Sequence, residues 1–282
     1  MPFIVGVGRS GTTLLRLMLD SHRDIAIPPE TGFIPSLLDL RENDQNAVQD
    51  LFLNTLTGDA RWNDFKISRE DMKDAIASIK PFSAPEGIRS FYKLYAKRFN
   101  KTRYGDKTPA YVSSMRMIGE ALPEARFIHL IRDGRDVALS LKRTWFSPGD
   151  SMEDLARYWS ERIVEARKQA KDISYYLEIR YEDLIWDTRD QLKKICDFIQ
   201  LPFDEQMESY YKRSRSRLDE VCDVAENARV ITKEQRLAQH PLISFPPDKS
   251  RIGVYKHEMH LEEIRRFESI AGKLMSDLGY EK

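Results

Sequence analysis

The strongest chemical signal in the chain is a short loop near its N-terminus, which contains the run Arg9-Ser10-Gly11-Thr12-Thr13-Leu14. An apolar run, residues 3–7, precedes it, and a helix-like apolar stretch follows it. In such a strand–loop–helix arrangement, glycines allow backbone N–H groups to wrap an anion at the positive end of the helix. Arg9 adds a guanidinium that can fork onto two anionic oxygens. The loop is therefore predicted to bind a phosphate-like group.

Position 12 restricts which phosphate compound the loop can serve. Loops of this kind in nucleoside triphosphatases carry a lysine there, which reaches the outer phosphates, whereas this chain has Thr12. An ordinary triphosphate is therefore not the predicted ligand. The alternative is that Gly6 and Gly11 only form a tight turn between a strand and a helix.

A second pair of polar residues follows the clearest buried strand, residues 125–131, whose nearly continuous apolar run is typical of a central parallel strand. His129 within it is predicted to be a core residue. Arg132 leaves the strand, and Ser140 lies two helical turns further on, so both can reach one phosphate near the N-terminus of that helix. An ion pair with a neighbouring aspartate is the alternative role, and it fits Arg135 better than Arg132.

Two charged residues follow other predicted strands. Glu30 comes directly after the strand 25–27 and its two prolines, and Lys107 stands at the end of another short strand. Because the ligand crevice of an open α/β sheet lies outside the carboxyl ends of its strands, both are expected on one rim with Arg9. The alternatives are a surface glutamate in the first turn of a helix and a solvated lysine.

Apolar periodicity predicts the elements that position these side chains. The strands 3–7, 25–27, 125–131 and 175–180 are separated by segments with helical spacing. We predict an α/β fold of three layers, in which helices flank a central, mainly parallel sheet. Residues 33–100 are predicted to form a helical excursion between two strands.

Composition narrows the possible partners. Lys plus Arg and Asp plus Glu are both 45 among 282 residues, so no global field favours nucleic acid or an anionic membrane. No stretch approaches the ~20 apolar residues of a membrane span, and the strand that starts by Phe3 leaves no room for a signal peptide. We therefore expect a cytoplasmic location. A length of 282 residues suits one large α/β domain or two small ones, and we expect a single domain, residues 1–282. The oligomeric state is left open, a homodimer included.

Metal and disulfide sites are not predicted. Cys196 and Cys222 are far apart and lack the spacing of a zinc site or a disulfide framework, so two reduced thiols are expected. His257 and His260 stand three apart without a third ligand nearby. The basic run 212–217 is predicted to be a solvated loop, with contact to an acidic acceptor or a nucleotide phosphate as the alternative.

The two anion-binding segments together resemble those of the sulfotransferases, enzymes that use 3′-phosphoadenosine 5′-phosphosulfate (PAPS). Residues 9–13 are similar to the phosphosulfate-binding loop of that family, in which Lys or Arg precedes Ser-Gly-Thr-Thr. Arg132 and Ser140 match its 3′-phosphate-binding segment. The resemblance covers most of the chain. It implies a P-loop-type fold, PAPS as the sulfuryl donor, 3′,5′-adenosine bisphosphate as its product, and no metal.

Three further phrases support this resemblance. Lys107 lies in Asp-Lys-Thr-Pro, similar to the segment whose lysine approaches the sulfuryl group, and Tyr181 in Tyr-Glu-Asp-Leu is similar to a residue that borders the adenine. Residues 250–253 are similar to the loop that closes over the nucleotide. The donor-binding residues that the resemblance implies are Arg9, Ser10, Gly11, Thr12, Thr13, Leu14, Arg132, Ser140, Tyr181, Ser250, Arg251, Ile252 and Gly253.

The resemblance also implies a mechanism, in which an acceptor hydroxyl or amine attacks the sulfur in line. Arg9, Lys107 and the loop N–H groups stabilise the leaving oxygen, as positioned cations do in phosphoryl transfer. The tyrosylprotein and glycosaminoglycan branches of the family use a glutamate after the second strand as general base, and Glu30 occupies that place. Catalytic roles are therefore predicted for Glu30, Lys107 and Arg9.

The acceptor is expected to be a small molecule, a lipid or a sugar. The tyrosylprotein enzymes carry further basic residues after the catalytic glutamate, whereas Thr31-Gly32-Phe33 follow here. The helical excursion 33–100 is expected to cover the acceptor site. Two other functions stay open: a P-loop small-molecule kinase, which would need a loop lysine and a Mg²⁺-binding acid, and a non-catalytic nucleotide-binding protein.

Overall fold

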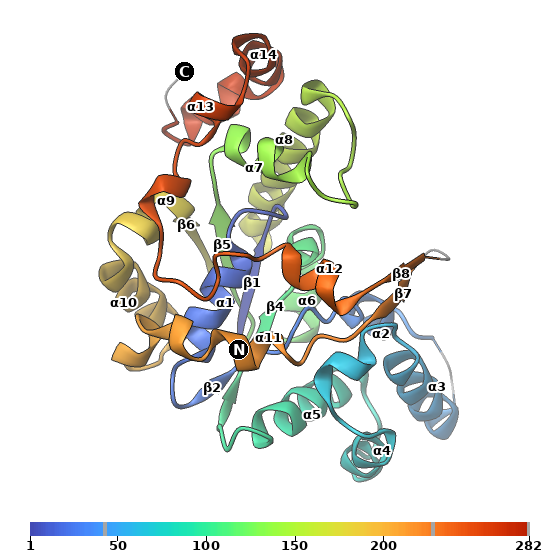
Figure 1. The fold of residues 1–282 in the computed structure, drawn as a ribbon. Coiled ribbons are helices and arrows are strands. Elements are labelled where there is room, and N and C mark those ends of the chain that lie inside the picture. The colour runs from blue at the N-terminus through green and yellow to red at the C-terminus, as the bar shows by residue number, and fades with distance from the viewer. Residues whose placement is uncertain (42–43, 227–228, 281–282) are drawn as a thin grey trace.

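A four-stranded parallel sheet forms the centre of the computed structural model, which describes residues 1–41, 44–226 and 229–280 (Figure 1). Its strands lie in the order β4-β1-β5-β6, and each pairs in parallel with its neighbours. The predicted parallel sheet is thus confirmed. The strands are β1 (Pro2–Gly6), β4 (Asp106–Lys107), β5 (Arg126–Ile131) and β6 (Tyr176–Arg180).

Helices connect and flank these strands. The α-helices are α1 (Thr12–Asp20), α2 (Ile34–Leu38), α3 (Gln45–Thr57), α4 (Arg69–Ala77), α5 (Ala84–Lys97), α6 (Met115–Ala121), α7 (Gly134–Leu141), α8 (Met152–Gln169), α9 (Tyr181–Trp186), α10 (Thr188–Ile199), α11 (Ser214–Leu218), α12 (Lys233–Ala238), α13 (Tyr255–Glu258) and α14 (Leu261–Asp277). The 3₁₀ helices are η1 (Trp62–Phe65), η2 (Pro109–Ser113), η3 (Ala170–Asp172), η4 (Glu205–Met207), η5 (Tyr210–Lys212) and η6 (Lys249–Arg251).

The alternation of side chains along the strands separates two core layers. Phe3 and Val5 of β1 face a cluster formed with the excursion helices and α6, whereas Ile4 faces a cluster formed with α1, α9 and α10. Phe127 and Ile128 of β5 divide in the same way. Because successive residues of a strand point to opposite faces, a buried sheet needs helices on both sides. The predicted three-layer architecture is therefore confirmed.

The excursion between the second and third strands consists of α2 to α5 with η1, as the helical spacing predicts. Ser68 and Ser83 begin α4 and α5, because each side chain accepts a hydrogen bond from the backbone N–H three residues later. Phe33, Phe65 and Phe91 pack edge to face at 5.0–5.8 Å between ring centroids. Their contacts give the excursion an aromatic core that is continuous with one face of the sheet.

Two small sheets lie outside the central one. The predicted second strand, β2 (Ile25–Ala26), pairs in parallel with β3 (Arg103–Tyr104), and β7 (Val224–Glu226) pairs antiparallel with β8 (Arg229–Ile231). Both Cys196 and Cys222 are free thiols, as expected. None of the helices in the described part of the chain combines the length and apolar character needed to cross a membrane.

The chain order of the strands places a crevice beside β1. From β1 the sheet extends to β4 on one side and to β5 on the other. The carboxyl end of β1 is therefore a topological switch point, where open α/β sheets bind ligands. Residues 210–226 and 229–251, which we call the cover segment, cross this crevice and form much of the orange ribbon in Figure 1. Arg9 holds this segment by donating from Nη2 to the carbonyl of Gln239 at 2.7 Å.

Candidate active site

A cavity of about 790 Å³ opens at the carboxyl ends of β1, β4 and β5. The structure brings most of the predicted site residues together in its wall, although they come from segments far apart in the sequence. The predicted residues that line it are Arg9, Gly11, Thr12, Thr13, Leu14, Glu30, Lys107, Arg132, Ser140, Tyr181 and Arg251.

The N-terminal loop presents the start of α1 to this cavity. Gly11 is the N-cap residue of α1, has φ of 96° and offers no side chain to cap the helix. The first backbone N–H groups of α1 therefore remain for an anion, and the helix dipole favours negative charge there. A Cβ at Gly11 would lie 2.5 Å from the ring of Tyr181. Glycine is thus required by the backbone angle and by the packed ring, beyond a simple need for a turn.

Replacing Gly11 by alanine is therefore expected to destabilise the loop. The positive φ and the contact with Tyr181 should together reduce the free energy of unfolding by about 1–3 kcal/mol. Urea unfolding of Gly11→Ala measures this loss. Gly8→Ala is the matched control in the same loop, because nothing lies within 4 Å of a Cβ there and its φ is not positive. Equal stability of the two variants would contradict the assignment.

The second predicted anion site adjoins the first. Arg9 donates from Nε to the Ser140 hydroxyl at 3.0 Å, so the loop arginine and the α7 serine are already in contact. Arg132 lies over the ring of Tyr181 at 4.5 Å and donates from Nη2 to the carbonyl of Arg251 at 2.7 Å. Its Nε is buried without a hydrogen-bond partner. The arginines thus form one continuous cationic surface that can hold several anionic groups.

Ion pairs clarify the alternative role of these arginines. Arg135 pairs with Asp133 at 2.8 Å and lies in the interior, as the alternative predicts. Arg132 also meets a carboxylate, that of Asp136, at 3.4 Å. Burial lowers the pKa of Arg9, and the nearby Arg132 lowers it further. Because Arg9 and Arg132 repel each other, an anion bound between them would lower the electrostatic energy of the site.

The predicted base and lysine form the centre of the cavity. Lys107 Nζ lies 2.6 Å from Glu30 Oε1 and 3.4 Å from the Thr13 hydroxyl. Lys107 is 4% exposed, so it is not the solvated lysine of the alternative. Burial raises the pKa of Glu30, but the adjacent Lys107 and Arg61 outweigh it and hold the pKa at about 2. Glu30 is therefore an ionised carboxylate at neutral pH.

Two residues of this centre were missed by the sequence prediction. Arg61, the N-cap residue of η1 in the excursion, donates to Glu30 Oε2 at 3.1 Å. His240 of the cover segment lines the cavity, and burial with the neighbouring Arg9 and Lys107 lowers its pKa to about 3, which keeps its imidazole neutral. No local pattern marks either residue, because both reach the site through tertiary contacts.

Four predicted donor-binding residues do not line the cavity. Ser10 is fully buried, and its hydroxyl has no partner beneath the loop. Ser250 is exposed and donates to Asp248, and Ile252 packs against the core around α1. Gly253 donates its N–H to Asp136 at 2.9 Å. In the loop 250–253 only Arg251 lines the cavity, and donor binding by the other three stays a prediction.

The burial of Arg217 and the residues that line the cavity bear on two further expectations. The basic run 212–217 is not wholly solvated, because Arg217 is buried and pairs with Asp20 at 2.6 Å. Among described residues of the excursion 33–100, only Arg61 lines the cavity. The cover segment supplies most of the remaining wall, and the covering of the acceptor site by the excursion stays a prediction.

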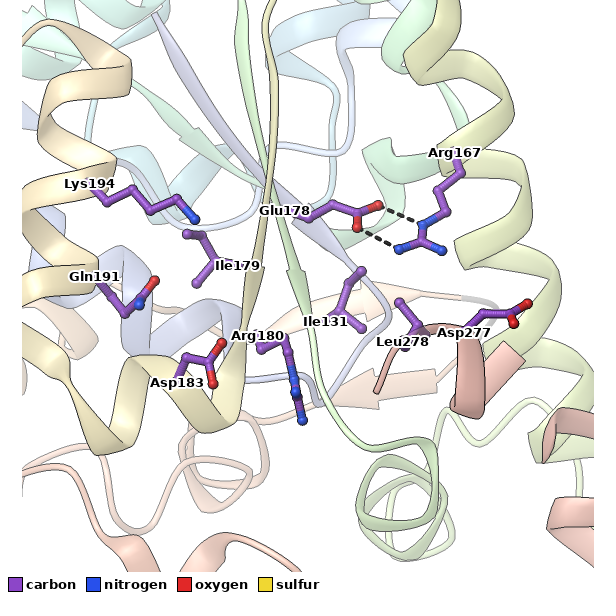
Figure 2. A pocket seen from close by; sticks show the side chains of 10 residues that line it. All are labelled: Ile131, Arg167, Glu178, Ile179, Arg180, Asp183, Gln191, Lys194, Asp277 and Leu278. Atoms are coloured by element: carbon purple, nitrogen blue, oxygen red, sulfur yellow. Dashed lines mark hydrogen bonds and ion pairs between the residues drawn. The ribbon is translucent and has the colours of Figure 1, made fainter. Parts of the chain in front are cut away.

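His129 is confirmed as a core residue. It is fully buried in β5, its Nδ1 lies 2.6 Å from the Tyr176 hydroxyl, and burial lowers its pKa to about 4. A smaller cavity of about 290 Å³ lies nearby at β6, and Figure 2 shows that Arg167 and Glu178 pair across it. Its lining contains none of the predicted site residues. Within residues 1–41, 44–226 and 229–280, no three His, Cys, Asp or Glu side chains gather as a metal site would require.

Comparison with known protein families gives a consistent match. The family model described as the sulfotransferase family matches residues 3–205. A protein-tyrosine sulfotransferase of Drosophila melanogaster is 28% identical over 210 residues, which is 72% of this chain and 38% of the relative. Protein-tyrosine sulfotransferase A of Caenorhabditis elegans is 27% identical over 216 residues, 73% of this chain and 51% of the relative. The chain thus spans about half or less of the length of these two relatives.

Solved structures of similar fold cover nearly the whole chain. The sulfotransferase domain of the Synechococcus olefin synthase superposes with a TM-score of 0.57 at 26% identity, over 96% of this chain and 94% of that domain. The sulfotransferase domain from the curacin biosynthetic pathway gives a TM-score of 0.58 at 20% identity, over 100% and 98%. The second likeness concerns the fold alone.

Proposed function

We infer the function from the premise that this chain belongs to the sulfotransferase family. We propose that it transfers a sulfuryl group from PAPS to a hydroxyl or amine of an acceptor. The observation that carries the proposal is the Lys107–Glu30 pair, 2.6 Å long, beside the start of α1 and the two arginines Arg9 and Arg132. A single cavity thereby combines an anion site, a cation for a leaving oxygen and a carboxylate base.

The residues present fit such a donor. The buried Arg132 Nε has no hydrogen-bond partner, which is costly unless an anion occupies the cavity beside it. Arg9, Arg132 and Arg251 supply permanent positive charge around the N-terminus of α1, where phosphate groups bind well. When bound, PAPS supplies the sulfuryl group and a bisphosphate leaving group.

The catalytic roles follow from charge and distance. Arg9, oriented by Ser140, and the N–H groups of α1 neutralise phosphate oxygens, and Lys107 Nζ donates to the oxygen on which charge develops. Glu30 takes the proton of the acceptor hydroxyl. A carboxylate of pKa about 2 is a weak base. As Lys107 turns towards the leaving oxygen, Glu30 loses a neighbouring cation and becomes more basic.

The identity of the acceptor is a finer proposal. We retain a small molecule, lipid or sugar as the acceptor class, because no basic residue follows Glu30 directly at positions 31–33. The relatives named above are protein-tyrosine sulfotransferases, so an acidic tyrosine peptide belongs in any acceptor screen. The cytoplasmic location, the absence of a metal requirement and the possible homodimer stay predictions.

Isothermal titration with 3′,5′-adenosine bisphosphate, AMP and ATP tests the donor site. The bisphosphate should bind more tightly than AMP, because Arg132 and Arg251 add a cationic surface beyond the loop. Arg132→Ala should weaken bisphosphate binding about 30-fold, as expected for a charged hydrogen bond worth roughly 2 kcal/mol. AMP binding should change less.

Arg143→Ala is the matched control, since this arginine lies shortly after Ser140 but its side chain is 61% exposed and pairs with Glu258. Bisphosphate affinity should stay within about twofold of the wild type in that variant. Equal or tighter binding of ATP, with Arg132→Ala silent, would contradict the second anion site and favour the kinase alternative.

A further inference from the structure

The cavity wall also contains residues outside the segments predicted to bind the donor. From Lys107 its wall follows η2, whose first residues Pro109 and Ala110 line it. Trp145 and Phe146, which come after α7, and Arg162 of α8 line the cavity as well. Arg162 contacts Ser113 at the end of η2, the element that follows Lys107, so we assign this part of the wall to the acceptor side.

Arg162 differs from several other arginines of the wall, which pair with carboxylates. Arg61 pairs with Glu30, Arg132 with Asp136 and Arg236 with Asp64. In the part of the chain that the structure describes, Arg162 forms no ion pair with a carboxylate. Its Nε is buried without a partner, and its Nη1 donates only a long hydrogen bond of 3.3 Å to Ser113.

The position of Arg162 is nevertheless well defined. Its guanidinium lies over the ring of Tyr158, 4.3 Å from the centroid, which fixes its plane and leaves the N–H edge to other partners. A half-buried guanidinium without a carboxylate partner gains from an anion, because charged hydrogen bonds are about twice as strong as neutral ones. The cavity is the open side from which such an anion can arrive.

Apolar surface surrounds the approach to Arg162. Trp145 and Phe146 pack edge to face at 5.2 Å between centroids, and Phe146 is 45% exposed. The cover segment adds further apolar side chains to the wall, among them Leu237, Leu242 and Ile243. An acceptor with an apolar body would bury both surfaces at roughly 25 cal/mol per Å².

We propose that Arg162 is a specificity-determining residue that binds an anionic group of the acceptor, a carboxylate in the simplest case. The acceptor is then an amphipathic hydroxy acid: its hydroxyl lies at Glu30, its apolar body lies along Trp145 and Phe146, and its acidic group pairs with Arg162. This inference rests on the proposed function and narrows its acceptor class.

Binding without turnover provides the first test. With the protein saturated by 3′,5′-adenosine bisphosphate, octanoate and octan-1-ol are titrated into the wild type, Arg162→Gln and Arg157→Gln. Octanoate should bind the wild type about tenfold more tightly than the alcohol, and Arg162→Gln should remove this preference. Arg157 lies on the same helix, is 52% exposed and pairs with Asp154, so its variant should behave as the wild type.

Transfer to matched acceptors provides the second test. The ratio of kcat/KM for 8-hydroxyoctanoate over octan-1-ol should be about tenfold in the wild type and near one in Arg162→Gln. Arg162→Lys should restore part of the ratio, because it keeps the charge but loses the planar fork. A merely structural role for Arg162 would lower both values together and leave their ratio unchanged.

Each result separates the two proposals. Bisphosphate binding in all variants supports the donor site independently of the acceptor, and its absence would overturn the proposed function. Undetectable or equal binding of octanoate and octan-1-ol to the wild type, or an unchanged preference in Arg162→Gln, would overturn the role of Arg162 while leaving the donor site intact.

Discussion

Glu30→Gln should lower kcat about 10³-fold while leaving bisphosphate affinity within about threefold of the wild type. A general base contributes typically 10²–10⁴-fold to a rate, and glutamine has no carboxylate with which to accept the acceptor's proton. The amide oxygen of glutamine can accept a hydrogen bond from Lys107 or from Arg61, which now lie 2.6 and 3.1 Å from the Glu30 oxygens, but its NH2 group cannot accept one from the other cation. Single-turnover transfer with saturating donor measures the chemical step directly.

The pKa of Glu30 sets the expected pH dependence of that step. Because Lys107 and Arg61 hold the pKa at about 2 against the opposite effect of burial, Glu30 stays ionised as the pH falls through 5. An acid limb of kcat/KM near pH 5–6 would therefore have to come from another group. Asp248→Asn is the matched control for Glu30→Gln, because Asp248 is the other carboxylate among the described residues that line the cavity. A Glu30→Gln rate within threefold of the wild type would exclude Glu30 as the base.

The sequence was most informative where function depends on adjacent residues. The strand–loop–helix arrangement around residues 9–14 was predicted correctly, because the strand, the glycines and the start of α1 follow one another directly in the chain. The meeting of Glu30 with Lys107 was also predictable, since parallel strands place their carboxyl ends on one edge of a sheet. The sequence pattern did not reveal which loop side chains line the cavity: Ser10 is buried in the interior, whereas Thr13 lines the cavity.

The cover segment could not be predicted for a different physical reason. Its short elements α11, α12, β7 and β8 have little periodicity, and they are held by contacts with distant parts of the chain. Arg236 pairs with Asp64 at 2.6 Å, 172 residues away, and Gln239 meets Arg9 across 230 residues. Propensity and periodicity describe neighbours in sequence, so residues such as His240 and Arg61 became recognisable only in the folded chain.

Arg217 shows the energetic consequence of such long-range contacts. It is the one member of the run 212–217 that donates to Asp20, with Nε and Nη2 at 2.6 and 3.0 Å, and it also meets Glu220 at 2.6 Å and Tyr95 at 2.8 Å. These groups are buried, and they join the cover segment to the C-terminal end of α1.

Arg217→Ala should therefore reduce the free energy of unfolding by about 3–5 kcal/mol, because it leaves the buried carboxylates of Asp20 and Glu220 without their main cation. Urea unfolding at pH 7 measures the loss. Arg215→Ala, an exposed position of the same run, should change stability by no more than about 0.5 kcal/mol. Similar effects of the two variants would mean that the run is solvated, as its composition first indicated.

The pH dependence of the free energy of unfolding tests whether Asp20 is the main partner of Arg217. Burial raises the pKa of Asp20, but Arg217, Lys101 and Arg16 outweigh it and leave the pKa below its usual value near 3.8. A lowered folded-state pKa stabilises the protein above the unfolded pKa and loses that contribution as the pH falls through the folded value. The difference between wild type and Arg217→Ala should thus be full at pH 7 and shrink below about pH 4. A double-mutant cycle with Asp20→Ala should show coupling above 1 kcal/mol, whereas additive losses would place the stabilising contact of Arg217 elsewhere in the network.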